Sequence, residues 1–92
     1  MKDLEMMNHS KPKVILIGEH HEAKYYIHHI LKQNVPIISI NESNYWHALR
    51  GYHKPTKFLI LNHSFKKLPV GVKLKVIEML KYSDCDIEFV DT

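Results

Sequence analysis

Short apolar segments occur at four places along this chain, at residues 13–18, 35–40, 57–62 and 86–91. The first three, KVILIG, VPIISI and KFLILN, are almost continuous in apolar residues, which is typical of strands covered on both faces of a sheet. The fourth, DIEFVD, alternates, with Glu88 between Ile87 and Phe89, as expected of a strand at a sheet edge. The pattern predicts three buried strands and one edge strand.

Segments with a helical period separate the predicted strands. The spacing after the first strand predicts a helix with one apolar stripe, made of Ala23, Tyr26, Ile27, Ile30 and Leu31. A short second helix is predicted within residues 42–51, with Gly51 as its C-terminal stop. A third helix should begin near Pro69 and reach about Tyr82, with these side chains turned inward: Val70, Leu74, Val76, Ile77 and Leu80.

This alternation of strands and helices predicts the fold class. It implies a parallel sheet with right-handed crossovers. We predict an α/β protein, a three-layer α/β/α sandwich whose four-stranded parallel sheet has the order 2-1-3-4, similar to a truncated flavodoxin-like or Rossmann-like fold. A half-Rossmann order of 3-2-1-4 is the alternative. Residues 13–92 should form a single domain after a flexible N-terminal lead-in at residues 1–12.

Composition narrows the class of protein. A chain of 92 residues with 45% hydrophobic and 25% charged residues is an ordinary globular domain. A single cysteine, Cys85, and an N-terminus without a signal-peptide apolar region predict a cytoplasmic protein. No apolar segment approaches the roughly 20 residues that cross a bilayer, so no membrane partner is expected. The wealth of Lys, Ile and Asn hints at a phage or a low-GC bacterium as the source.

Polar residues follow the predicted strands at the sheet edge where open α/β sheets bind ligands. In the order 2-1-3-4, the segment GEHHE after the first strand should face NHSF after the third. This placement predicts a cleft for a nucleotide or another small polar metabolite, with these candidate residues: His20, His21, Asn41, Glu42, Asn62, His63 and Ser64. The opposing interpretation is that such loops are polar because Ser, Asn and Asp cap helices.

The motifs of common enzymes and nucleotide sites are absent from the sequence. The segment IGEHHEA contains neither GxGxxG nor GxxxxGK[ST], and Ser64 beside His63 is not part of a GxSxG elbow. A receiver-type phosphorylation site needs an aspartate where this chain has Asn62. An acid–base pair of His20 and His63 remains compatible with the predicted cleft. We therefore favour a protein that is not an enzyme, with no catalytic residue and no cofactor.

The histidines of the first predicted helix do not have the spacing of metal ligands. His21 lies seven and eight residues before His28 and His29, which corresponds to roughly 10–12 Å of helix rise. Two ligands of one ion on a helix are normally three or four residues apart. No metal site is predicted.

Aromatic residues outside the apolar stripes favour contact with other proteins. Tyr25 lies outside the stripe of the first helix and Trp46 outside that of the second, although packing of Trp46 under the loop at 51–55 is an alternative. The candidate interaction residues are Tyr25, Trp46, Phe65, Lys66 and Lys67. The leading hypothesis is a small non-enzymatic binding or regulatory module that acts through protein contacts.

The basic residues leave a weaker third hypothesis. The net charge is +3, and Arg50 is the one arginine among 13 basic residues. Sequence-specific nucleic-acid readout favours arginine, so it is not expected here. Nonspecific binding of nucleic acid by the lysine-rich segment SFKKLPVGVKLKV remains an alternative.

The predicted fold lacks the fifth strand and last helix of a full flavodoxin-like domain. The sheet face over the third and fourth strands, beside the first helix, should therefore expose apolar surface, which commonly marks an interface. We expect a homodimer through this face. The segment LEMM (Leu4, Met6, Met7) and a foreign partner are alternative covers.

Overall fold

The computed structural model describes residues 13–91 and contains one four-stranded parallel sheet in the order β2-β1-β3-β4. The strands are β1 (Lys13–Ile17), β2 (Ile37–Ile38), β3 (Thr56–Leu61) and β4 (Asp86–Val90). The predicted order 2-1-3-4 is confirmed, and the half-Rossmann order is wrong. The predicted lead-in at 1–12, which includes the LEMM segment, lies outside the described residues.

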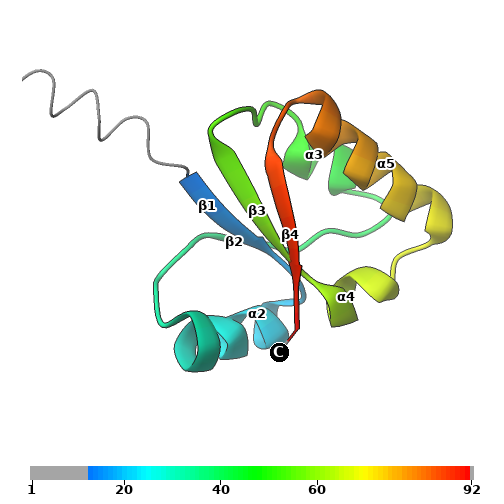
Figure 1. Cartoon of the computed structure of the whole chain (residues 1–92). Helices are drawn as coiled ribbons and strands as arrows, with labels where there is room; N and C mark the ends of the chain where they lie inside the picture. The colour runs from blue at the N-terminus through cyan, green and yellow to red at the C-terminus, as the bar shows by residue number, and fades with distance from the viewer. Residues whose placement is uncertain (1–12, 92) are drawn as a thin grey trace, which may run out of the picture.

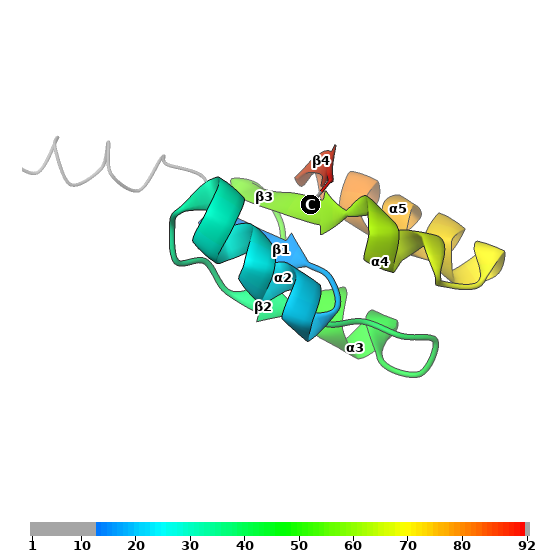
Figure 2. The ribbon, with the colours of Figure 1, turned by 90° about the horizontal axis from the view of Figure 1, so that it is seen from below.

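Helices cover both faces of the sheet and make a three-layer α/β/α arrangement (Figure 1). Helix α2 (His20–Tyr26), continued by the π-helical turn η1 (Ile27–Leu31), lies on one face. Helices α3 (Tyr45–Leu49) and α5 (Val70–Tyr82) lie on the other face. Figure 2 shows the sheet between these two helical layers. Among residues 13–91, no helix is long and apolar enough to cross a membrane.

Alternation along β1 and β3 divides the core into two clusters. Neighbouring residues of a strand point to opposite faces, so each strand contributes to both clusters. The cluster against α3 and α5 contains Ile15, Ile17, Leu49, Phe58, Ile60, Val72, Val76, Leu80 and Cys85. The cluster against α2 contains Leu16, Ala23, Tyr26, Ile27, Leu59 and Leu61. The continuous apolar segments of these strands follow from burial on both sides.

Two predicted strands have different bounds in the structure: β2 is shorter, and β3 is displaced by one residue toward the N-terminus. Residues 35–40 form a strand only at Ile37–Ile38, because Pro36 has no N–H to donate to the ladder. Asn62, predicted as the last residue of a strand, instead begins helix α4 (Asn62–Lys66). The lysine-rich segment SFKKLPVGVKLKV therefore starts within a short helix.

The predicted inward stripe of α5 was wrong at two positions. Val72, Val76 and Leu80 are buried, whereas Val70 and Leu74 are 69% and 63% exposed. Residues two apart on a helix are rotated by about 200°, so Leu74 and Val76 cannot both face the sheet. The sheet packs against the stripe with the larger buried set, and Leu74 faces outward.

The π-helical turn η1 explains a second error in the predicted stripes. Lys32 N–H donates to the Ile27 carbonyl oxygen at 2.7 Å, five residues back, and Lys32 has a left-handed φ of 57°. A π-helical turn holds more residues than an α-helical one, so positions within it are rotated relative to the α-helical stripe. Ile30, predicted to face the core, is 46% exposed for this reason.

The sheet face over β3 and β4 is less apolar than predicted. Among the described residues, Leu59 and Leu61 are buried there, and Lys57 forms an ion pair with Glu88 at 2.8 Å. The hydrogen bond to Glu88 and its charge raise the pKa of Lys57. Charged side chains therefore interrupt the apolar surface on which the expected homodimer rested, and dimerisation through it stays a prediction.

Gly18, the first residue after β1, lies so close to β3 that it has no room for a side chain. A Cβ atom at this position would lie 2.5 Å from Leu61 Cδ1 and 3.0 Å from its Cγ. Leu61 is 1% exposed and packed among core residues, so it has little freedom to move away. The constraint holds the loop after β1 directly against the end of β3.

We expect Gly18→Ala to destabilise the fold by about 1–3 kcal/mol, because the added methyl group overpacks the core. The measurement is the free energy of unfolding from urea denaturation. The matched control is Gly71→Ala in α5, where an added Cβ meets no atom within 4 Å; it should be neutral or stabilise by up to about 1 kcal/mol. Equal effects of the two substitutions would contradict the close contact with Leu61.

Candidate functional site

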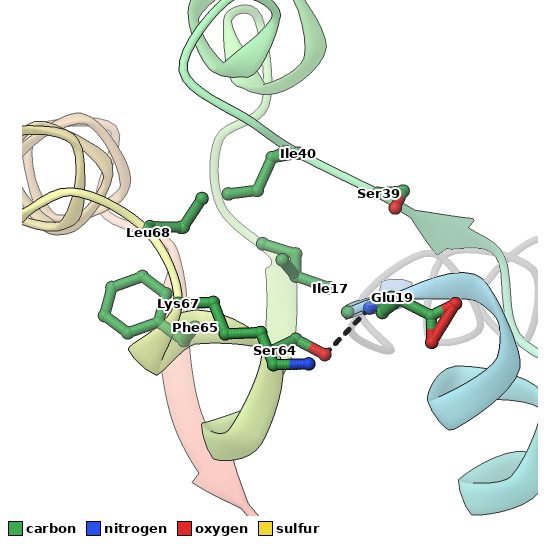
Figure 3. A pocket seen from close by; sticks show the side chains of 9 residues that line it. Ile17, Glu19, Ser39, Ile40, Ser64, Phe65, Lys67 and Leu68 are labelled. Carbon is green, nitrogen blue, oxygen red and sulfur yellow. Dashed lines mark hydrogen bonds between the residues drawn. The ribbon is translucent and has the colours of Figure 1, made fainter.

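The segments that follow β1, β2 and β3 meet at the C-terminal edge of the sheet and line a pocket of about 180 Å³. Figure 3 shows Ile17, Ile40 and Leu68 pointing toward the same space. The residues that line the pocket are Ile17, Gly18, Glu19, Ser39, Ile40, Ser64, Phe65, Lys67 and Leu68. The pocket lies between the two strands at which the sheet order reverses, where open α/β folds bind ligands.

The segments GEHHE and NHSF face each other across this edge, as the sequence predicts. The Glu19 N–H donates to Ser64 Oγ at 2.8 Å (Figure 3). The Ser64 hydroxyl donates to one carboxylate oxygen of Glu22, and His63 Nδ1 hydrogen-bonds with the other. We name these four residues the Glu22 cluster (Glu19, Glu22, His63, Ser64). It joins the start of α2 to α4.

The carboxylate of Glu22 is stabilised in its charged form. The hydrogen bond from Ser64 lowers its pKa most, and the hydrogen bond and charge of His63 lower it further. A carboxylate can only accept hydrogen bonds, so Nδ1 of His63 carries the proton of this contact. A carboxylate with a lowered pKa is a weak general base, which argues against proton abstraction by Glu22.

The hydroxyl of Ser64 already donates one hydrogen bond and accepts another. It donates to Glu22 and accepts from the backbone of Glu19, while His63 bonds Glu22 and not Ser64. Nucleophilic catalysis needs a base in hydrogen-bond contact with the attacking hydroxyl. The geometry supports a structural role for Ser64 rather than an activated nucleophile. No hydrogen bond links His20 to His63 within residues 13–91, so the acid–base pair considered from the sequence has no support.

The N-terminus of α2 already holds a carboxylate. The Glu19 side chain accepts hydrogen bonds from the backbone N–H groups of His21, at 3.0 Å, and Glu22, at 3.3 Å. The bond from His21 is the main cause of the lowered pKa of Glu19. A phosphate group uses the same backbone donors at a helix N-terminus. Glu19 must therefore move before a phosphate can bind there.

The other candidate ligand residues lie outside the pocket lining. The rings of His20 and His21 are exposed with centroids 6.4 Å apart. Asn41 Oδ1 accepts from the N–H groups of Ser43, at 2.8 Å, and Asn44, at 2.9 Å. The Asn41 contacts fit the opposing interpretation of polar loops as caps.

Three further residues can be compared with their predicted roles: Glu42, Asn62 and Lys67. Glu42 is exposed, and Asn62 Nδ2 donates to Asp91 Oδ1 at 3.0 Å. Of the seven predicted ligand residues, Ser64 alone lines the pocket, whereas Lys67, predicted for interaction, also lines it. Among residues 13–91, no three His, Cys, Asp or Glu side chains are grouped so that they could hold a metal ion.

Sequence reasoning missed Glu22 as the centre of the cluster. Its signal was present, because Glu22 is the last residue of the segment GEHHE, which was predicted to face NHSF. Gly18 and Ser39 were also missed as pocket-lining residues. They carry no chemical group that distinguishes them from ordinary loop residues.

A second hollow lies between α3 and α5 on the outer surface of the helical layer. It has a volume of about 390 Å³ and is lined by Trp46, Lys75, Glu78, Met79 and Tyr82. We name it the α3/α5 groove. Trp46 is 53% exposed and Tyr82 94% exposed. The structure thus places Trp46 beside α5, while Tyr52 of the 51–55 loop packs on Phe58 with ring centroids 5.4 Å apart.

The remaining candidate interaction residues differ in exposure. Tyr25 is 54% exposed and stacks on His29 with ring centroids 4.5 Å apart. Phe65 is half-buried and packs on Phe89 at 5.3 Å, so it belongs to the pocket wall and the core. Lys66 and Lys67 are exposed after β3, and the ammonium of Lys73 donates to the Lys66 carbonyl oxygen at 3.3 Å.

No protein-family model, no curated protein and no solved structure matches this chain. The chemistry of the pocket and of the groove is therefore inferred from their own geometry.

We expect Glu22→Gln to destabilise the fold by about 1 kcal/mol at pH 6, because it removes the charge from two hydrogen bonds. The pKa of Glu22 is lower in the folded protein than in the unfolded chain, so its contribution is complete above the unfolded pKa. That contribution is lost as the pH falls through the folded pKa. The difference in free energy of unfolding between wild type and Glu22→Gln should therefore shrink from pH 6 to pH 3.

The matched control is Glu42→Gln, which removes an exposed carboxylate from the loop after β2. Its effect at pH 6 should stay within about 0.5 kcal/mol. A difference between wild type and Glu22→Gln that is constant from pH 6 to pH 3 would contradict the stabilised carboxylate.

Proposed function

We propose that the protein is a small, non-enzymatic, cytoplasmic binding module that acts through contacts with another protein at the α3/α5 groove. The observation that carries this proposal is the pair of exposed aromatic side chains, Trp46 and Tyr82, at one apolar hollow. Trp and Tyr are enriched among the residues that dominate binding energy at protein interfaces. The cytoplasmic location is supported by the buried, unpaired Cys85, which suits a reducing compartment.

Burial of this surface is favourable on binding. Each Å² of apolar surface removed from water contributes roughly 25 cal/mol to binding. The indole of Trp46 is half exposed and the ring of Tyr82 is almost fully exposed, so a partner can still bury much of their apolar surface. Met79, which is half-buried and packed against the core, lies among the lining residues. Lys75 and Glu78 supply polar groups to the same lining. An apolar centre with a polar border is the usual anatomy of a protein interface.

The Glu22 cluster supports the non-enzymatic part of the proposal. Its hydroxyl, carboxylate and imidazole groups bond one another and the backbone of α2. Groups satisfied in this way hold two elements together and are not free to act on a substrate.

Replacement of Trp46 by the photo-crosslinking residue p-benzoylphenylalanine, in cells that produce the protein naturally, should yield adducts with another protein. The matched control is the same replacement at Lys24, which is exposed but lies on α2, on the other side of the sheet, and is not a candidate interaction residue. Adducts should be absent or much weaker there. The proposal fails if position 46 yields no adduct, or if both positions yield the same adducts.

A small-ligand domain is the second candidate function, and the pocket built from three strand-end loops favours it. Its volume of about 180 Å³ is below the roughly 300–1,000 Å³ of pockets that enclose a drug-sized ligand. Glu19 occupies the donors that a phosphate would use. Both observations favour a small polar metabolite over a nucleotide, with Lys67 and Ser39 as its polar contacts.

Thermal-shift measurements with small carboxylic acids, amino acids and sugars test this second function. A metabolite at 100 times its Kd should stabilise the fold by about 2.7 kcal/mol, and Lys67→Ala should reduce the shift in Tm. The control is Lys66→Ala, an exposed neighbour outside the lining, which should keep the full shift. If no compound stabilises the wild type, or if Lys67→Ala responds fully, this function is wrong.

A further inference from the structure

We infer that the outer edge of β4 binds an extended segment of a partner protein in which basic and apolar residues alternate. β4 pairs with β3 on one side only, and the order β2-β1-β3-β4 places it at an edge of the sheet (Figure 2). A strand at an edge presents a row of N–H and C=O groups without a ladder partner. An extended peptide that forms those hydrogen bonds becomes an additional strand.

β4 offers more backbone for such pairing than the opposite edge of the sheet. It has five residues, whereas β2 has two and follows Pro36, which has no N–H to donate. Among residues 13–91, no segment pairs with the outer side of β4. Asp86, Glu88 and Phe89 are exposed. A partner strand therefore finds both backbone groups and side chains to contact.

The side chains of β4 differ between the two faces of the sheet. Val90 packs against the core cluster under α2, and Asp86 and Glu88 share its face because side chains two residues apart point the same way. Phe89 lies on the opposite face and packs on Phe65, with ring centroids 5.3 Å apart. Opposite charges and apolar contacts across neighbouring strands both stabilise pairing. The partner strand therefore needs basic side chains on one face and apolar side chains on the other, which means alternate positions.

The charge of this edge selects a basic partner. Residues 84–91 hold four acidic side chains and no basic one: Asp84, Asp86, Glu88 and Asp91. Two of them pair with lysines, Asp84 with Lys54 at 3.4 Å and Glu88 with Lys57 at 2.8 Å. Lys57 is in register with Asp86, but its ammonium reaches Glu88, so Asp86 has no ion-pair partner within the described residues. A lysine or arginine beside Asp86 in a neighbouring strand supplies that partner.

A second copy of this chain fits the edge less well. An antiparallel two-fold contact between two copies of β4 places the same strand on both sides. The register that pairs all five residues sets Glu88 opposite its own counterpart, and like charges directly opposite each other destabilise pairing. Charged side chains on edge strands commonly prevent association of identical strands. The same charges attract a strand of opposite sign.

The test measures fluorescence anisotropy of fluorescein-labelled peptides, slightly longer than β4, mixed with the full chain. In the first peptide lysine and valine alternate, in the second the same lysines and valines form two blocks, and in the third glutamate replaces lysine. The alternating basic peptide should bind about tenfold more tightly than the other two. Added NaCl should weaken its binding, because salt screens the charges at an exposed edge.

Backbone N-methylation distinguishes an added strand from ionic attraction alone. In an extended alternating peptide, the backbone N–H groups of the lysines point to one side and those of the valines to the other. Methylation of the set that faces β4 removes the donors of the new ladder and should abolish binding. Methylation of the other set should leave the affinity nearly unchanged, since those groups face solvent.

Charge reversal at Asp86 tests the position of the basic side chains. Asp86→Lys should weaken the alternating basic peptide roughly three- to tenfold, because it exchanges a cross-strand attraction for a repulsion, and it should strengthen the glutamate peptide. The matched control is Glu42→Lys, which makes the same charge change in the loop after β2, at the opposite edge of the sheet. This control should change neither affinity, and circular dichroism checks that both variants are folded.

Four results would overturn the inference. Equal binding of the alternating and block peptides would leave ionic attraction without an added strand, as would equal effects of the two sets of N-methyl groups. Absence of binding by all three peptides would remove the edge as a docking surface. Dimers of the wild type that the basic peptide dissociates would assign the edge to a second copy. None of these results bears on the α3/α5 groove, whose lining contains no residue of β4.

Discussion

The pairing of β1 with β3 is the contact on which the rest of this fold depends. Five residue pairs, from Lys13 with Thr56 to Ile17 with Ile60, join the two strands in the centre of the sheet. Their alternate side chains supply both core clusters, so each helical layer packs against the same two strands. Parallel pairing also brings the two strand ends to one edge, where Gly18 approaches Leu61 and the backbone of Glu19 meets Ser64. The pocket and the Glu22 cluster follow from this pairing.

Polar residues at that edge have two different roles, and the hydrogen bonds that each residue makes distinguish the two roles. Those of Glu19, Asn41 and Ser64 go to backbone N–H groups or to neighbouring side chains, and they hold the ends of helices in place. A group that is satisfied by its own fold has little free-energy gain left for a ligand, because bonding to the ligand requires breaking the existing contact. Within the described residues, Lys67 and Ser39 line the pocket and their side chains form no hydrogen bond to the rest of the fold, whereas the rings of His20 and His21 lie outside the lining.

Most of the fold was predictable from the sequence because continuous apolar segments and helical stripes report burial directly. The strand order followed from the alternation of elements and from the polar residues of the edge strand. The errors occurred where the pattern is degenerate or the geometry is irregular. In α5, apolar residues lie on both sides, and only packing against the sheet selects Val76 over Leu74. In η1, a five-residue backbone hydrogen bond changes the period itself.

The candidate site was predictable in position but not in its members. Strand order fixes the edge at which the loops meet, so GEHHE and NHSF could be placed opposite each other. Which side chains point into the pocket depends on loop and helix conformation. Asn62 is an example: because it begins α4 instead of ending β3, the side chains after it turn with a helix, and Ser64 and Lys67 reach the pocket while His63 reaches Glu22.

The α3/α5 groove has its origin in the shortness of α3. This helix has five residues, whereas α5 has 13, so α3 covers only part of the length of its neighbour. Leu49 is buried and Tyr45 and Ala48 are half-buried toward the core. Trp46 lies about 100° around the helix from Tyr45, at the flank of α3 rather than opposite the core. From that position the indole reaches sideways to α5, but the short helix provides no further turn to cover it. Its half exposure is thus a consequence of the short backbone of α3.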